Sequence, residues 1–192
     1  MTIQNILPWN TVGEVCFMDN EFAAITHGHP LGYYSAGLFA LIIHNIINRM
    51  TVLEAVLDSL GVFSARCHAG KLTSLIEWAV ELSGSSETPE VCIRSLGLGW
   101  VAEEALAIAV FSALRAGDDF RKGVIMAVNH SGDSDSAGSI TGNILGAYLG
   151  LNAIPVDWVR NVELSAEILE LADDLRVGFQ EGDRWWSKYP GW

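Results

Sequence analysis

The chain has 192 residues, half of them hydrophobic and 18% charged, so it can bury one core and its composition does not indicate disorder. Its formal net charge is −12, from 23 acidic and 11 basic residues, and such a surface repels the phosphates of nucleic acid. We therefore expect a single helical domain over residues 1–192 and no nucleic-acid partner.

Cysteine usage and the apolar segments indicate the cellular compartment. Cys16, Cys67 and Cys92 are too scattered for a disulfide framework, and none has the CxxC spacing of a zinc site. The longest apolar run, AGLFALIIHNII, is interrupted by His44 and Asn45 well short of a membrane span. These features predict a cytoplasmic protein without a membrane partner.

Apolar residues recur at helical spacing along most of the chain, and no segment alternates as a half-buried strand does. We therefore predict an all-α fold, an irregular helical bundle. Pro30 suits the first turn of a helix, and Thr51 with Glu54 forms a capping box. In chain order, the expected helices cover residues 30–49, 51–66, 69–82, 88–95, 100–116, 118–128, a glycine-rich segment within 131–150, and 162–177, followed by turns and aromatic residues.

The most informative segment is SGDSDSAGSITGNILGAYLG at residues 131–150. Its opening turn carries Asp133, Asp135 and Ser136, whose side-chain oxygens are the hard ligands that Mg²⁺ prefers. The same residue types cap helix N-termini and suit the positive end of the helix dipole. The residues alone therefore leave two interpretations, a cation site and a capping cluster.

Glycines recur every four residues in this segment, at positions 138, 142, 146 and 150. Residues four apart lie on one face of a helix, and each glycine costs roughly 1 kcal/mol of helix stability relative to alanine. We therefore expect another helix to approach this face closely.

Other chemistry-bearing residues have simpler interpretations. Glu103 and Glu104 are adjacent, so their side chains leave a helix about 100° apart and at most one faces a cleft. His29 precedes Pro30 and is expected to be a turn or cap residue, whereas His130 either tunes the acidic loop or hydrogen-bonds its turn. The aromatic tail, with Trp185, Trp186, Tyr189 and Trp192, either packs on the helices or offers a stacking surface.

The stretch GWVAEEALAIAVFSALRAGDDFRKGVIMAVNHSGDSDSAGSITGNILGAYLGLNAIPVDWV resembles the carboxyl-terminal half of the ADP-ribosylglycohydrolase family. The shared features are a GW-x-AEEAL helix, an AVN segment that leads into Gly-Asp-Ser/Thr-Asp-Ser/Thr, a helix of small residues, and an exit with proline. Upstream, ITHGHPLGYYSAGLFALIIHNI is similar to the family's TH-x-x-P turn and the helix after it. Together these segments cover about residues 25–175.

This resemblance implies an all-helical fold around two Mg²⁺ ions that hydrolyses an N- or O-glycosidic bond between ADP-ribose and a protein side chain or small acceptor. By position, it assigns Asp133, Asp135 and Ser136 as metal ligands, with serine where threonine is commoner. It places His27, on the TH motif, at the edge of the substrate cleft, where it can donate to a ribose hydroxyl or phosphate. ADP-ribose or an ADP-ribosylated protein is the expected partner.

The family's upstream motifs are not found in this chain, among them the Thr-Asp-Asp helix start that supplies the opposing metal ligands. Only one set of Mg²⁺ ligands is therefore expected here, and no catalytic residue is assigned. We expect hydrolysis to need a further segment, a complementary chain or a homo-oligomer. The alternative is a non-catalytic ADP-ribose-binding or protein-interaction module in which the acidic loop is only a cap.

Overall fold

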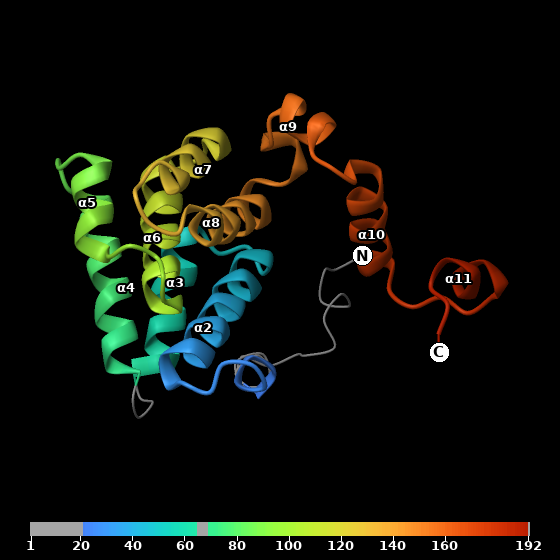
Figure 1. Ribbon diagram of the computed structural model, residues 1–192, viewed down its shortest axis with the longest axis horizontal. Helices are drawn as coiled ribbons and strands as arrows, with labels where there is room; N and C mark the ends of the chain where they lie inside the picture. The colour runs from blue at the N-terminus through green and yellow to red at the C-terminus, as the bar shows by residue number, and fades with distance from the viewer. Residues whose placement is uncertain (1–20, 65–68, 192) are drawn as a thin grey trace. The chain divides into compact units, whose positions relative to one another are not determined.

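The computed structural model describes residues 21–64 and 69–191, which contain helices and turns but no β-strand. The all-α prediction is confirmed. Figure 1 shows the helices in chain order. They are α2 (Pro30–Ile47), α3 (Val52–Ser64), α4 (Gly70–Ser83), α5 (Pro89–Leu96), α6 (Ala102–Ala116), α7 (Phe120–Val128), α8 (Ser134–Leu149), the 3-10 turn Leu151–Ala153, α9 (Val156–Asn161), α10 (Ser165–Val177) and α11 (Asp183–Lys188).

The predicted helices up to α8 match the structure to within a few residues, but the carboxyl-terminal part differs. Helices α9 and α11 each have only six residues, too few to show a helical period in the sequence. Helix α10 begins at Ser165 rather than at 162 because Leu164 has a left-handed backbone, with φ of 58°, which interrupts the helix. Gly61 lies within α3, which continues to Ser64.

Local hydrogen bonds fix several helix starts as predicted. The Thr51 amide donates to Glu54 Oε2 at 2.9 Å, and the Glu54 amide donates to Thr51 Oγ1 at 3.3 Å, which is the expected capping box. These hydrogen bonds, the one from the Thr51 backbone first, hold the pKa of Glu54 below its usual range. His29 Nδ1 accepts from the Leu31 amide at 3.2 Å, and Asp119 caps α7.

Helix α6 is the central helix of the unit formed by the described residues up to 155. It packs against α2, α4, α7 and α8, and Leu106, Ile108 and Phe111 are fully buried along it. This explains why its sequence is apolar on most faces, because a helix with neighbours on several sides buries nearly its whole surface.

One charged side chain of α6 ties that helix to the end of α4. The Arg115 guanidinium donates to the carbonyl oxygens of Leu82 at 3.3 Å, Ser83 at 3.0 Å, Ser85 at 2.5 Å and Glu87 at 2.7 Å. A cation at a helix carboxyl terminus satisfies free carbonyl groups and suits the helix dipole. Arg115 therefore holds both the end of α4 and the loop after it.

The glycine stripe of α8 permits close helix approach at one position rather than at four. A Cβ on Gly138 would lie 2.5 Å from Val128 Cγ1 of α7, whereas on Gly146 it would meet only Phe120, at 4.0 Å. A Cβ on Gly142 would meet no atom of the described residues within 4 Å apart from its chain neighbours and the backbone of its own helix, and Gly150, with φ of 78°, ends the helix. The four-residue spacing of α8 therefore describes only part of the contact, because the other close approach is made by a glycine of α7: a Cβ on Gly123 would lie 2.4 Å from Leu145 Cδ1 of α8.

Helix α2 is long and apolar enough to cross a membrane by length and composition alone. Core helices of water-soluble proteins satisfy the same criterion, and α2 packs against α3, α6 and α8. Polar residues also lie inside this packing, since the Asn45 side chain donates to Asp58 at 3.0 Å and to Ser59 at 3.2 Å. The absence of a membrane partner stays a prediction.

Residues 156–191 belong to a second compact unit. Within it, Asp174 accepts hydrogen bonds from Lys188 and from the Tyr189 hydroxyl, the latter at 2.8 Å, and Lys188 also lies 2.5 Å from Glu170. The Trp185 ring packs near Tyr189, with centroids 5.0 Å apart. These contacts join α10 to α11 and the aromatic residues around it.

The Asp174 contact predicts a pH dependence within this unit. Hydrogen bonds from Lys188 first, and then from Tyr189, hold the pKa of Asp174 below its ordinary 3.8. The stability from this contact is therefore present above pH 3.8 and is lost as the pH falls through the lower folded-state pKa. In an NMR titration of side-chain carboxyl carbons, Lys188→Met should raise the Asp174 pKa. An Asp174 pKa of 3.8 or more in the wild type would contradict the contact.

Candidate functional site

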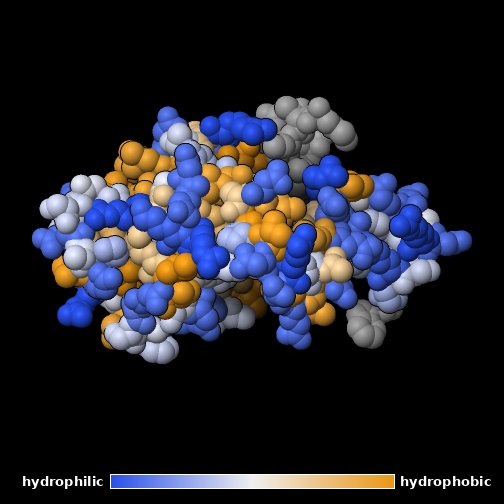
Figure 2. Space-filling model, turned by 90° about the horizontal axis from the view of Figure 1, so that it is seen from above, coloured by the Kyte–Doolittle hydropathy of each residue, from blue (hydrophilic) through white to orange (hydrophobic). Residues whose placement is uncertain are grey.

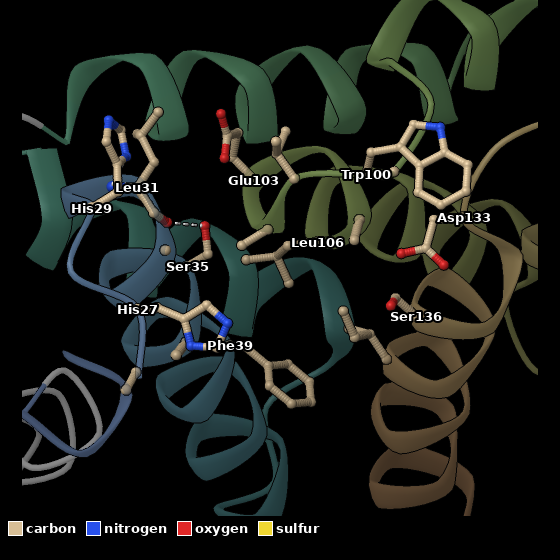
Figure 3. Close-up of a pocket in the computed structure, with 18 of the residues that line it drawn as sticks. His27, His29, Leu31, Ser35, Phe39, Trp100, Glu103, Leu106, Asp133 and Ser136 are labelled. Carbon is tan, nitrogen blue, oxygen red and sulfur yellow. Dashed lines mark hydrogen bonds between the residues drawn. The ribbon is translucent and has the colours of Figure 1, made fainter. Parts of the chain in front are cut away.

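A cavity of about 950 Å³ lies in the unit that ends at residue 155, and its volume is within the range of small-molecule sites. Figure 3 shows its side chains, which come from segments far apart in the sequence. The polar and aromatic residues that line it include His27, His29, Ser35, Lys71, Trp100, Glu103, Asp133 and Ser136.

Four helices present their first turns to this cavity. The lining includes Leu31 and Ser35 of α2, Lys71 of α4, Glu103 of α6 and Ser136 of α8. The first turn of a helix carries unpaired N–H groups and the positive end of the helix dipole. Converging helix starts therefore suit a ligand that has negative charge, such as a phosphate group.

The acidic loop lies at one side of the cavity. Asp133 and Ser136 both line it, whereas Asp135 is exposed and is not among the lining residues. Asp133 occupies the N-cap position of α8, but its side chain makes no capping hydrogen bond. Its carboxylate oxygens are therefore not used by the backbone at the start of α8, which weakens the interpretation of this loop as only a cap.

The two carboxyl groups of this loop lie next to each other. A hydrogen bond with the Asp133 carboxyl, and then one from the Ser136 amide at 2.8 Å, holds the pKa of Asp135 below its usual range. Two adjacent carboxylates and a hydroxyl fit one side of a Mg²⁺ site, which takes about six oxygens. Nowhere in residues 21–64 and 69–191 do three or more His, Cys, Asp or Glu side chains gather as metal ligands, so the fit is partial.

The predicted substrate-binding residue, His27, lies on the cavity wall near the start of α2 (Figure 3). Its Nδ1 is 2.8 Å from Thr26 Oγ1, and its side chain is exposed. Its contact with a ligand stays a prediction. His130, by contrast, accepts from the Gly132 amide at 3.1 Å through Nδ1 and so holds the turn before the acidic loop.

The adjacent glutamates have different surroundings, as the helix geometry predicts. Glu103 lines the cavity and is only 6% exposed at its side chain, where its Oε1 lies 2.8 Å from Lys71 Nζ. That contact raises the pKa of Lys71. Glu104 instead accepts from the amides of Leu98 and Gly99, at 3.0 and 3.1 Å.

Lys71 and Trp100 are wall residues that were not singled out from the sequence. Trp100 is 69% exposed, and Figure 3 shows its indole beside Asp133. A largely exposed tryptophan is uncommon and offers a flat face for a planar ligand. Its position directly before α6 was the available signal, whereas no local pattern identified Lys71. Of the three cysteines, Cys92 is buried, and Cys16 and Cys67 lie outside the described residues.

Comparison with known proteins gives consistent matches. A family model for ADP-ribosylglycohydrolase matches residues 14–184. ADP-ribosylhydrolase ARH3 of Homo sapiens is 28% identical, over 91% of this chain and 55% of that protein, and ARH3 of Bos taurus is 27% identical over the same shares. ADP-ribosylarginine hydrolase Tri1 of Pseudomonas putida is 32% identical over 43% of this chain and 21% of that protein. The chain spans about half the length of the ARH3 relatives and matches their carboxyl-terminal half.

Proposed function

Because the chain belongs to the ADP-ribosylglycohydrolase family, we propose that its cavity binds an ADP-ribosyl group and contributes to Mg²⁺-dependent hydrolysis. The bond cleaved is an N- or O-glycosidic bond between ADP-ribose and a protein side chain or small acceptor. The observation that carries this proposal is the convergence of Asp133, Ser136 and His27 on one cavity, although more than a hundred residues separate the histidine from the acidic loop.

The side chains have distinct roles in this proposal. Asp133, Asp135 and Ser136 hold Mg²⁺ through their oxygens, and His27 donates a hydrogen bond to a ribose hydroxyl or a phosphate. When bound, Mg²⁺ supplies positive charge that offsets charge on the phosphates or the leaving group. The converging helix starts add backbone N–H groups for the diphosphate.

Among the described residues, the acidic loop and His27 provide only part of what hydrolysis requires. An oxocarbenium-like transition state needs a positioned water or carboxylate as well as charge stabilisation, and three oxygens from one loop do not complete a Mg²⁺ shell. We therefore propose that activity requires a further segment, a complementary chain or a second copy. ADP-ribose or an ADP-ribosylated protein is then the substrate.

Exposed apolar side chains support this need for a partner. Leu53 and Leu57, one turn apart on α3, are 44% and 52% exposed. Figure 2 shows apolar patches among the hydrophilic residues of the surface. Apolar surface of this kind favours association. Cysteine usage continues to predict a cytoplasmic protein, and the net charge of −12 predicts that it does not bind nucleic acid.

The alternative is a non-catalytic module that binds ADP-ribose or another protein. The incomplete ligand set of the acidic loop favours it, because binding requires fewer groups than catalysis. The two functions differ in turnover. If millimolar Mg²⁺ and ADP-ribose bind, but ADP-ribosylated arginine and serine are not hydrolysed even with a complementary chain, non-catalytic binding is the correct function.

Both functions require the chain to bind ADP-ribose, and ligand-induced stabilisation tests this binding. Ligands present at about 100 times their dissociation constant stabilise a protein by roughly 2.7 kcal/mol, so Mg²⁺ with ADP-ribose should raise the melting temperature by roughly 5–10 °C. The double variant Asp133→Asn, Asp135→Asn should lose this gain. As a matched control, Asp118→Asn with Asp173→Asn removes the same charge from other exposed positions and should keep it. An unchanged wild-type melting temperature would contradict both functions.

A further inference from the structure

Two loops meet beside the cavity, residues 97–99 before α6 and residues 131–133 before α8. The Asp133 amide donates to the Leu98 carbonyl oxygen at 2.7 Å, so the backbone of the acidic loop is hydrogen-bonded to the other loop. A Cβ on Gly99 would lie 3.1 Å from the Asp133 carbonyl oxygen. The two backbones are therefore in close contact, with little room for either loop to move alone.

A single peptide group links Glu104 to Asp133. The carbonyl of the Leu98–Gly99 peptide accepts from the Asp133 amide, and the N–H of the same peptide donates to Glu104 Oε2 at 3.1 Å. Glu104 Oε2 also accepts from the Leu98 amide at 3.0 Å. Hydrogen bonds on both sides of one peptide group polarise and strengthen each other. Removing the Glu104 carboxylate should therefore also weaken the hydrogen bond that holds the Asp133 backbone.

The carboxylate of Glu104 is well placed for this role. It extends from the first turn of α6, where negative charge suits the helix dipole. It also packs against Gly97, whose φ of 127° and lack of a side chain leave room for it, since a Cβ there would lie 2.6 Å from Glu104 Oε2. Charged acceptors form stronger hydrogen bonds than neutral ones, so the carboxylate anchors the loop better than an amide would.

From this chain of contacts we infer that Glu104 is a positioning residue for the acidic loop: it holds the Leu98–Gly99 peptide, which fixes the Asp133 backbone and so the place of its carboxylate at the cavity. Glu104 does not itself line the cavity, unlike its neighbour Glu103. Its effect on Mg²⁺ rests on the proposed function, whereas its effect on the loop does not.

Hydrogen exchange measures the loop directly, without metal. In Glu104→Ala, the Asp133 and Gly99 amides should exchange with solvent at least about tenfold faster, because the hydrogen-bonded peptide is released. In Glu104→Gln, whose side-chain oxygen still accepts, most of the protection should return. NMR-detected exchange on the full chain resolves these amides. Wild-type protection of the Asp133 amide in Glu104→Ala would overturn the inference.

Metal affinity gives the second measurement. Residues that orient metal ligands typically change affinity by about 10–100-fold when removed, so calorimetry should show Mg²⁺ binding weaker by about that factor in Glu104→Ala. Arg115→Met, a destabilising substitution at the other end of α6, serves as the control for lost stability and should keep wild-type affinity. Equal losses in both variants, or none in Glu104→Ala, would overturn the inference. If the wild type binds no Mg²⁺, the proposed function fails and hydrogen exchange alone decides the role of Glu104.

Discussion

Gly132→Ala is expected to lower the melting temperature by roughly 10 °C and to release the acidic loop from residues 97–99. A Cβ at this position would overlap the Leu98 carbonyl oxygen and would lie 2.6 Å from its carbonyl carbon and 2.9 Å from its Cα. All three are backbone atoms, so no side-chain rotation relieves the overlap. Overpacking of this kind costs about 3 kcal/mol or more in severe cases, and each kcal/mol corresponds to roughly 2–4 °C at this chain length.

The substitution should also weaken any binding of Mg²⁺ by the acidic loop. Displacing the loops breaks the 2.7 Å hydrogen bond between the Asp133 amide and Leu98, so any Mg²⁺-dependent stabilisation should fall together with the melting temperature. Calorimetric unfolding with and without Mg²⁺ measures both.

Gly142→Ala is the matched control for Gly132→Ala. Gly142 lies within α8, and apart from its chain neighbours and the backbone of α8 itself no atom of the described residues would lie within 4 Å of the added Cβ. Alanine should therefore stabilise the chain by up to about 1 kcal/mol through helix propensity. Equal melting temperatures for the two alanine variants would show that residues 97–99 and 132 are not packed as described.

Arg115→Met is expected to destabilise the chain by about 3 kcal/mol. The guanidinium donates to four carbonyl groups at the end of α4 and in the loop after it. A hydrogen bond to a charged group contributes about 1.5–3 kcal/mol, but Arg115 is only partly buried, so water replaces most of the four bonds and the net loss corresponds to about one of them. Methionine retains most of the apolar stem, so the change isolates the hydrogen bonds from the packing. Urea unfolding followed by circular dichroism measures the free energy of unfolding.

Arg115→Lys tests whether geometry or charge matters at this position. A lysine ammonium keeps the charge but lacks the planar fork that reaches several carbonyls at once, so this variant should recover less than half of the lost stability. Arg94→Met, at an exposed position of α5, is the control and should change stability by less than about 0.5 kcal/mol. Full recovery by lysine would show that the charge at the α4 terminus is sufficient.

Features that depend on neighbouring residues in the sequence were predicted well. The capping box of Thr51 and Glu54 involves residues three apart, and His29 caps α2 through a residue two positions away. The fold class and most helix bounds follow from apolar spacing of the same short range. The family was also evident before the structure, because its motifs are contiguous stretches such as the acidic loop with Asp133.

Short helices and the close approach of helices were predicted less well. Helices α9 and α11 are shorter than two turns, so their sequences carry little periodic signal. The glycine stripe indicated close contact at every glycine of α8, but only Gly138 lies against a side chain of α7, Val128, and the second close approach is made by Gly123 of α7 against Leu145. Which residues of two packed helices meet depends on the side chains of both helices, so the sequence of one helix does not determine it.

The order of the residues was enough to show that the chain is all-α, where most of its helices begin, and which loop carries side-chain oxygens of the kind that Mg²⁺ prefers. Packing in three dimensions was needed to show that Glu103 lines the cavity while Glu104 holds the neighbouring loop, and that Arg115 reaches carbonyls 28 to 33 residues away. The difference is one of range. Capping and helical periodicity act within about four residues, whereas a cavity is made by side chains that meet only after the helices have packed.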